Sequence, residues 1–167
     1  MVEVLIEVAL KDRGVLRRLS ARFVPMSPGA LVAATREAIA QATYFDPRHL
    51  NHNFDYDYEA YAEGQQNLGC LTQAGELRLA MELAIELITH GSHQVEASDE
   101  GLMTQDIENC LIPVIRAVET STLPAAEGIA WCSAMLHSDR VGFIARERLE
   151  SLRAQFQAVA APNPAVE

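Results

Sequence analysis

Residues 76–89 carry charged side chains on only one narrow stripe. Arg78, Glu82 and Glu86 recur at every fourth position, and nearly all the residues between them are apolar. Because an α-helix has 3.6 residues per turn, this spacing places the three charged groups on one side and apolar groups around the rest. A helix of this kind has to be packed on several sides. The stretch therefore predicts a central helix within an array of helices.

The rest of the chain predicts further helices and no sheet. Apolar residues recur at helical spacing over 12–23, 27–43, 55–74, 98–120, 123–136 and 139–159. Residues 2–10 fit both a strand and a helix face, and we favour a helix because no partner strand follows. About eight helices with short connections predict an all-α fold of antiparallel pairs, arranged as an α-solenoid or TPR-like array. We expect one helical domain over 1–160 and a flexible tail over 161–167.

Particular residues indicate where these helices begin and end. Ser27 and Pro28 form a typical helix start, since the serine caps and proline loses no hydrogen bond at the first position. Gly75 and Gly91 are expected to end two helices. Pro113 predicts a kink within 98–120, because it removes a backbone donor from a helix interior. The expected caps of the remaining helices are Asp12, Asp55, Ser98 and Asp139.

Acidic side chains are concentrated in one part of the chain. The net charge is −10, but residues 55–110 hold twelve acids and one base, a net charge of −11, and the remainder is close to neutral. Arginines 13, 17, 18 and 22 make the N-terminal part mildly basic. General nucleic-acid binding is not expected, because phosphate contacts need clustered cations. The acidic stretch predicts a solvated surface, a docking face for a basic partner, or a nucleic-acid mimic.

Composition and cysteine spacing indicate the compartment. No apolar run approaches the roughly 18 residues that a membrane span requires, so we expect no membrane association. Cys70, Cys110 and Cys132 are far apart and form no CxxC pair, which predicts three free core thiols. Reduced thiols are typical of the cytoplasm, which is the location we predict.

Asp55, Asp57 and Glu59 have the first three spacings of a calcium-binding loop. The sixth position is Ala60 instead of glycine, and the twelfth is Gln66 instead of a bidentate glutamate. A helix start with acids in its first turn explains the same residues. We therefore expect no calcium site here.

Four of the five histidines form two His-x-x-His pairs, His49/His52 and His90/His93. Two such pairs could build a zinc site if they met in space. Gly91 and its polar neighbours predict that the second pair lies at a helix end or in a loop. We expect exposed histidines, and neither a metal nor another cofactor.

Six of the ten aromatic residues fall within 18 positions of the chain. One interpretation is that they pin the loop 44–54 onto the helices. The other is that they line a groove for a peptide, in which aromatic residues are favoured anchors. The six are Tyr44, Phe45, Phe54, Tyr56, Tyr58 and Tyr61.

Over about residues 31–150 the chain resembles a helical, TPR-like domain that accompanies SWIM zinc fingers in some bacterial proteins. The matching segments are ATYFD at 42–46, YEAY at 58–61, LTQAG at 71–75 leading into LAI at 83–85, and SDEG at 98–101. The SWIM cysteine–histidine motif is absent, so no metal ligand can be carried over. The resemblance implies a helical-repeat interaction module.

These observations together favour a non-enzymatic protein–protein interaction module. The expected partner is a protein with a basic patch, bound through the aromatic and acidic region 44–110, and a homodimer is a further expectation. A small acidic inhibitor that blocks a basic surface is the alternative, and an enzyme comes third. The expected partner-binding residues are Tyr56, Tyr58, Tyr61, Glu82, Glu86, Asp99 and Glu100.

Overall fold

A computed structural model describes residues 26–46, 56–98 and 101–161. These residues form helices and contain no strand, as the sequence predicts. The helices are α3 (Pro28–Ala42), α4 (Tyr58–Gln73), α5 (Leu77–Glu96), α6 (Thr104–Glu119), α7 (Ala125–Ser138) and α8 (Arg146–Ala160). The two helices predicted over 2–10 and 12–23 lie outside the described residues, as do residues 47–54 of the loop predicted over 44–54. The expectation of about eight helices is therefore confirmed only for these six.

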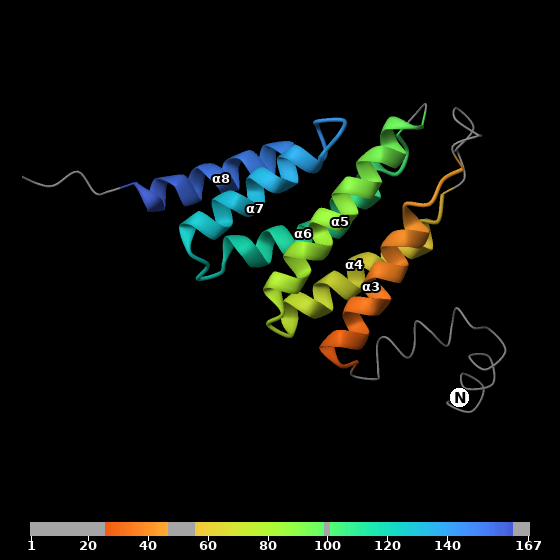
Figure 1. Cartoon of the computed structure of the whole chain (residues 1–167), viewed down its shortest axis with the longest axis horizontal. Coiled ribbons are helices and arrows are strands. Elements are labelled where there is room, and N and C mark those ends of the chain that lie inside the picture. Colours follow the sequence, from red (N-terminus) through yellow and green to blue (C-terminus); the bar gives the residue numbers. More distant parts are fainter. Residues whose placement is uncertain (1–25, 47–55, 99–100, 162–167) are drawn as a thin grey trace, which may run out of the picture.

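Helix α5 lies at the centre of the array. It packs against α3, α4, α6 and α7, whereas α3 and α4 form one extensive pair and α7 and α8 another. Figure 1 shows α5 crossing between these two pairs, with the α7–α8 pair on one side and α3 on the other. The stripe pattern of residues 76–89 predicted this central position correctly.

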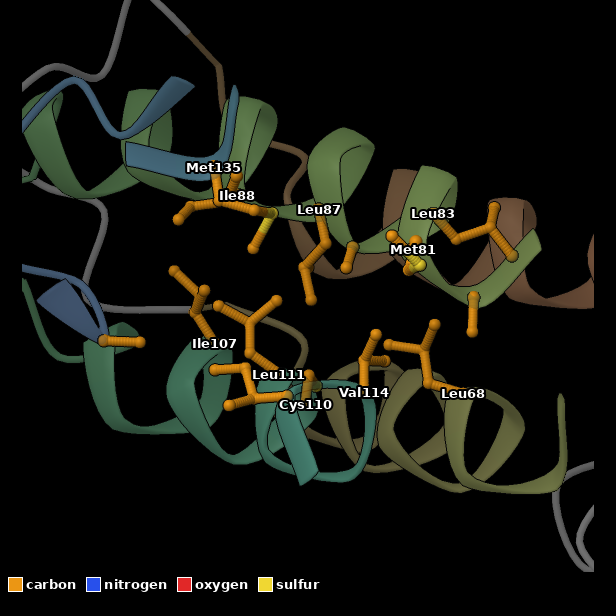
Figure 2. Packing of buried hydrophobic residues seen from close by; sticks show 14 of the residues in the cluster. Leu68, Met81, Leu83, Leu87, Ile88, Ile107, Cys110, Leu111, Val114 and Met135 are labelled. Atoms are coloured by element: carbon orange, nitrogen blue, oxygen red, sulfur yellow. The ribbon is translucent and has the colours of Figure 1, made fainter. Parts of the chain in front are cut away.

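A single apolar core surrounds α5. Leu87 and Ile88 of α5 face Ile107 and Leu111 of α6 across the interior (Figure 2), and all four side chains are buried. Fully burying an aliphatic side chain of this size contributes about 1.5–3 kcal/mol. Among the described residues no helix is long and apolar enough to cross a membrane.

The start of α3 and the end of α4 follow their sequence signals. Ser27 Oγ accepts a hydrogen bond from the Ala30 N–H, with Pro28 in the first helical position. Gly75 has a φ of +82°, and the N–H groups of Gly75 and Glu76 bond to the carbonyls of Thr72 and Leu71. This is a Schellman turn, which favours glycine because a side chain strains the left-handed backbone.

Gly91 does not end α5, contrary to the sequence prediction. The helix continues to Glu96, and Gly91 is buried within it. An added Cβ at Gly91 would lie 2.8 Å from Cδ1 and 3.1 Å from Cγ1 of Ile107. The glycine therefore allows α6 to approach α5 closely. Sequence alone does not distinguish this use of a glycine from a helix end.

Three predicted helix caps are corrected by the structure. The side chain of Asp57 caps α4, with Oδ1 accepting from the Ala60 N–H at 2.9 Å, whereas the predicted cap Asp55 lies outside the described residues. Ser98 Oγ accepts from the Gly101 N–H and so closes a turn before α6, which begins only at Thr104. Asp139 likewise serves a loop, where its oxygens accept from the N–H groups of Val141 and Ile144.

Two polar contacts fasten α7 to α5. Trp131 Nε1 donates to the carbonyl of Met81 at 3.0 Å. Ser92 is fully buried, and its hydroxyl donates to the Ser138 carbonyl and accepts from the Arg140 N–H, both at 3.1 Å. These bonds satisfy buried polar groups that would otherwise destabilise the interface.

We predict opposite effects for two glycine substitutions within helices. Gly91→Val should lower the free energy of unfolding by about 2 kcal/mol, because the added atoms collide with the buried side chain of Ile107. Gly69→Ala in α4 is the control, since a Cβ there meets nothing within 4 Å. It should raise the stability by about 1 kcal/mol through helix propensity. Urea unfolding followed by circular dichroism measures both, and equal stabilities would contradict the close α5–α6 approach.

Candidate functional site

The chain leaves α3 through a short segment that carries two aromatic rings. Thr43 closes the helix end, with Oγ1 donating to the Ile39 carbonyl at 2.7 Å. Tyr44 follows, and its side chain is 74% exposed. The ring of Phe45 meets His93 of α5 edge to face, with centroids 5.0 Å apart. One aromatic side chain is thus directed to solvent while its neighbour rests on α5.

A buried amide fixes this segment against α5. Gln94 is 1% exposed, and its Nε2 donates to the carbonyls of Ala42, at 3.0 Å, and Tyr44, at 3.3 Å. Its Oε1 accepts from the hydroxyl of Tyr61 at 2.6 Å. One side chain of α5 therefore joins the end of α3 to α4. The backbone of Tyr44 is held by a partly buried hydrogen bond, next to the two buried hydrogen bonds that Gln94 makes with Ala42 and Tyr61.

A pocket of about 390 Å³ opens beside this segment, between the last turns of α3 and the middle of α5. Its lining combines apolar, aromatic and charged side chains. A pocket of this volume suits one or two side chains of a peptide or a small ligand. The lining residues are Arg36, Ile39, Ala40, Thr43, Tyr44, Phe45, Glu86 and His90.

Arg36 and Glu86 form a bidentate ion pair at the edge of this pocket. Nη2 of Arg36 lies 2.8 Å from Oε1 of Glu86, and Nε lies 3.1 Å from each carboxylate oxygen. This hydrogen bond and the attraction of Glu86 raise the pKa of Arg36, and Glu82 adds a further attraction. The pair joins α3 to α5 with the fixed fork geometry that a guanidinium offers to a carboxylate.

The three tyrosines predicted to bind a partner occupy different environments. Tyr61 is 2% exposed, and burial raises its pKa above the usual value, so its ring belongs to the core. The ring of Tyr56 meets that of Tyr61 edge to face at 6.0 Å. Partial burial and a 2.8 Å hydrogen bond to Asp106 Oδ2 raise the pKa of Tyr56 to about 12. Tyr58 alone is presented to solvent, at 66% exposure.

The predicted acids are also separated by the structure. Glu82 and Glu86 share the polar stripe of α5, but Glu86 is half-buried and paired with Arg36, whereas Glu82 is exposed. Asp99 and Glu100 lie outside the described residues. The sequence prediction included Tyr44 and Phe45 in the region 44–110 but did not name them as binding residues. Arg36 was missed because nothing local relates it to a glutamate 50 positions away.

Arginines from outside the acidic stretch neutralise part of it. Arg140, which follows α7, bonds through Nε to Oε2 of Glu96 at 2.6 Å, and Arg36 pairs with Glu86 as above. The carboxylate of Glu108 accepts from the Ala145 N–H at 3.0 Å. The acidic excess that the sequence shows over 55–110 is therefore not a uniform negative surface.

Neither His-x-x-His pair is completed into a metal site by the residues that the structure describes. His90 and His93 are exposed in the last two turns of α5, which extends past Gly91. No group of three metal-binding side chains occurs among the described residues, and His49 and His52 lie outside them. Of the two predicted positions for His90 and His93, a helix end or a loop, the structure agrees with the helix end, because both residues lie in the last two turns of α5.

The thiols fit the core more closely than a reactive site. Cys110 and Cys132 are buried, and burial raises their pKa values to about 12 and about 11. Thiols of this kind are protonated at neutral pH and are poor nucleophiles. Cys110 Sγ donates to the Tyr61 carbonyl at 3.1 Å. Cys70 is only half-buried, so the prediction of three core thiols is confirmed for two.

A second pocket, of about 370 Å³, lies between α6 and the start of α8. Two of its polar side chains are engaged within the chain. Glu108 accepts from the Ala145 N–H, and Arg146 donates to the Gly142 carbonyl and to Glu150. These bonds hold Ala145 in a left-handed conformation, with φ +52°. These polar groups of the pocket therefore stabilise the turn between α7 and α8.

No protein-family model, no curated protein and no solved structure matches the chain. The resemblance to the helical domain found with SWIM zinc fingers therefore stays a prediction. The described residues form an array of helices with a pocket of mixed apolar and charged character between α3 and α5.

We predict that Gln94→Leu destabilises the protein by about 3 kcal/mol. The change leaves the Tyr61 hydroxyl and two backbone carbonyls without their partner, and an unsatisfied buried group costs about 1–3 kcal/mol. Gln66→Leu on the exposed side of α4 is the control and should change stability by less than about 0.5 kcal/mol. Chemical unfolding compares the two, and equal losses would show that Gln94 does not secure the end of α3.

Proposed function

We propose that the chain is a protein–protein interaction module that binds a basic segment of its partner at the pocket between α3 and α5. The observation that carries this proposal is Tyr44. A tyrosine that is 74% exposed stands at the mouth of a preformed pocket, while the backbone beneath it is fixed by Gln94. Tyrosine is among the residues that contribute most to binding energy at protein interfaces.

The rigidity of this site supports recognition by docking. A segment whose backbone is already fixed loses less conformational entropy when a partner binds, so more of the contact energy appears as affinity. The apolar lining residues Ile39, Ala40 and Phe45 can contact an aliphatic or aromatic anchor of the partner. The pocket is therefore suited to a short segment with one apolar anchor.

The charge at the edge of the pocket supports a basic partner. Glu82 is exposed on the same stripe of α5 as Glu86, and the full chain carries a net charge of −10. Arg36 already neutralises Glu86, so an arginine or lysine of the partner is best placed beside Glu82. Like-charged partners are disfavoured by the surrounding negative potential.

The alternative of a nucleic-acid mimic receives less support from the described residues. A mimic needs many carboxylates that are free to imitate phosphates. Here Glu86, Glu96 and Glu127 are paired with arginines of other elements, and Glu108 bonds to the backbone. The docking proposal uses Glu82 alone and so agrees better with this distribution.

The proposed setting follows the sequence expectations. We propose a cytoplasmic, non-enzymatic module in which helix pairs stack as in a helical repeat, in agreement with the central position of α5 and the pairs α3–α4 and α7–α8. Helical repeats present such surfaces to other proteins. Association with a second copy is a further part of the proposal, since the ends of stacked helices leave surface to be covered.

We predict that Tyr44→Ala weakens partner binding about thirtyfold, as expected for an interface residue worth about 2 kcal/mol. The probes are peptides selected from a displayed library for binding to the full chain, and fluorescence anisotropy measures their affinities. The selected peptides should combine an apolar anchor with arginine or lysine. Tyr58→Ala is the matched control, because this tyrosine is similarly exposed but does not line the pocket. Equal loss in both variants, or selection of acidic peptides, would contradict the proposal.

We further predict that Glu82→Lys weakens the same peptides about fivefold at low ionic strength, since an exposed charge contributes up to about 1 kcal/mol. The effect should largely disappear in about 1 M salt, where charges are screened within about 3 Å. Glu147→Lys on α8 makes the same change in net charge far along the chain and serves as control. An unchanged affinity in Glu82→Lys would remove the charged part of the proposal.

A further inference from the structure

One side of α3 is not covered by any described element. The helix packs on α4 and α5 through Leu31, Thr35, Ala38 and Ile39. Its opposite side is exposed and leads to the pocket and Tyr44. The exposed residues on that side include Ala30, Ala33, Glu37 and Ala40. The pocket and the adjoining side of α3 form one continuous surface, which we call the α3 face.

Residues 1–25 lie outside the part of the chain that the structure describes, but their sequence has a distinct character. The segment 11–23 holds five bases and one acid, a net charge of +4. Its apolar residues at 15, 16, 19 and 23 fall on one side of a helix, and arginines occupy much of the remainder. This is the pattern of a basic amphipathic helix.

The described part of the chain is complementary in charge. It contains sixteen acids and seven arginines, a net charge of −9. Around the α3 face, Glu37 and Glu82 are exposed, and Glu86 stands at the edge of the pocket. The basic segment and this acidic surface therefore attract one another within a single chain.

The connection between them has a suitable length. Only residues 24–27 separate the segment from the first residue of α3, Pro28. A helix rises about 1.5 Å per residue, so both the twelve residues 12–23 and the twelve residues from Pro28 to Ile39 measure about 18 Å. A segment of this length can therefore extend along α3 from Pro28 to the pocket.

We propose that the segment 11–23 docks on the α3 face of its own chain and occupies the pocket between α3 and α5 until a partner displaces it. Its apolar side covers the alanines and the pocket, and its arginines meet Glu37 and Glu82. The inference rests on the proposed function only for the displacement by a partner. The self-docking itself does not depend on it.

Paramagnetic broadening in the full chain tests the self-docking. A nitroxide at Gln41→Cys, exposed at the end of α3, should broaden the amide signals of residues 12–23. The control carries the nitroxide at Ala154→Cys, exposed on α8, and should leave those signals sharp. Cys70→Ala in both proteins removes the half-buried native thiol. The double change Arg17→Glu and Arg18→Glu should reduce the broadening from the first label, as should high salt.

Three results would overturn the self-docking. The first is no broadening from the label at position 41, and the second is equal broadening from both labels. The third is broadening in a mixture in which one chain carries the spin label and a separate chain carries the isotope label. The last result would assign the α3 face to a second copy. The proposed function fails separately, when no selected peptide depends on Tyr44. Added peptide should sharpen the signals of residues 12–23 if both proposals hold.

Discussion

The burial of α5 on nearly all sides is the constraint on which the rest of the structure depends. A helix with one polar stripe can be stable only if other helices cover its apolar circumference, and α3, α4, α6 and α7 do so. This requirement places four of the described helices around α5, while α8 packs mainly on α7. It also explains Gly91, because a central helix with four neighbours needs at least one position where a neighbour can approach its backbone.

A helix buried in this way must also satisfy its own polar side chains. Ser92 and Gln94 are buried in its last turns, and each bonds to the end of another helix and to the chain that follows it. Ser92 bonds to Ser138 at the end of α7 and to Arg140 after it. Gln94 bonds to Ala42 at the end of α3 and to Tyr44 after it. The candidate site is thus a consequence of packing. Tyr44 is held in position because the chain that leaves α3 supplies the acceptors that a buried glutamine requires.

Short sequence signals predicted where several helices begin and end. Contacts between residues far apart in the sequence were not predicted. The start of α3 at Ser27 and Pro28 and the end of α4 at Gly75 follow from backbone chemistry within a few residues. The role of Gly91 depends on Ile107, which no local pattern reveals. Asp139 was expected to cap α8 because a short acid before an apolar run is ambiguous between a helix cap and a loop. Its oxygens instead hold Val141 and Ile144, before the helix begins.

The distribution of charge along the sequence differs from the distribution of charge on the folded surface, and this difference bears on the proposed function. Counted along the sequence, the region 55–110 is strongly negative, but Arg36 and Arg140 reach into it from outside and pair with Glu86 and Glu96. Exposed pairs of this kind contribute little to stability, so their main effect is on the pattern of the surface potential. They leave Glu82 exposed on the same stripe of α5 as Glu86, which lines the pocket together with Tyr44. Under the proposed function, a partner that combines one apolar anchor with one cation matches this surface, and this combination is a more selective feature than a broad negative field.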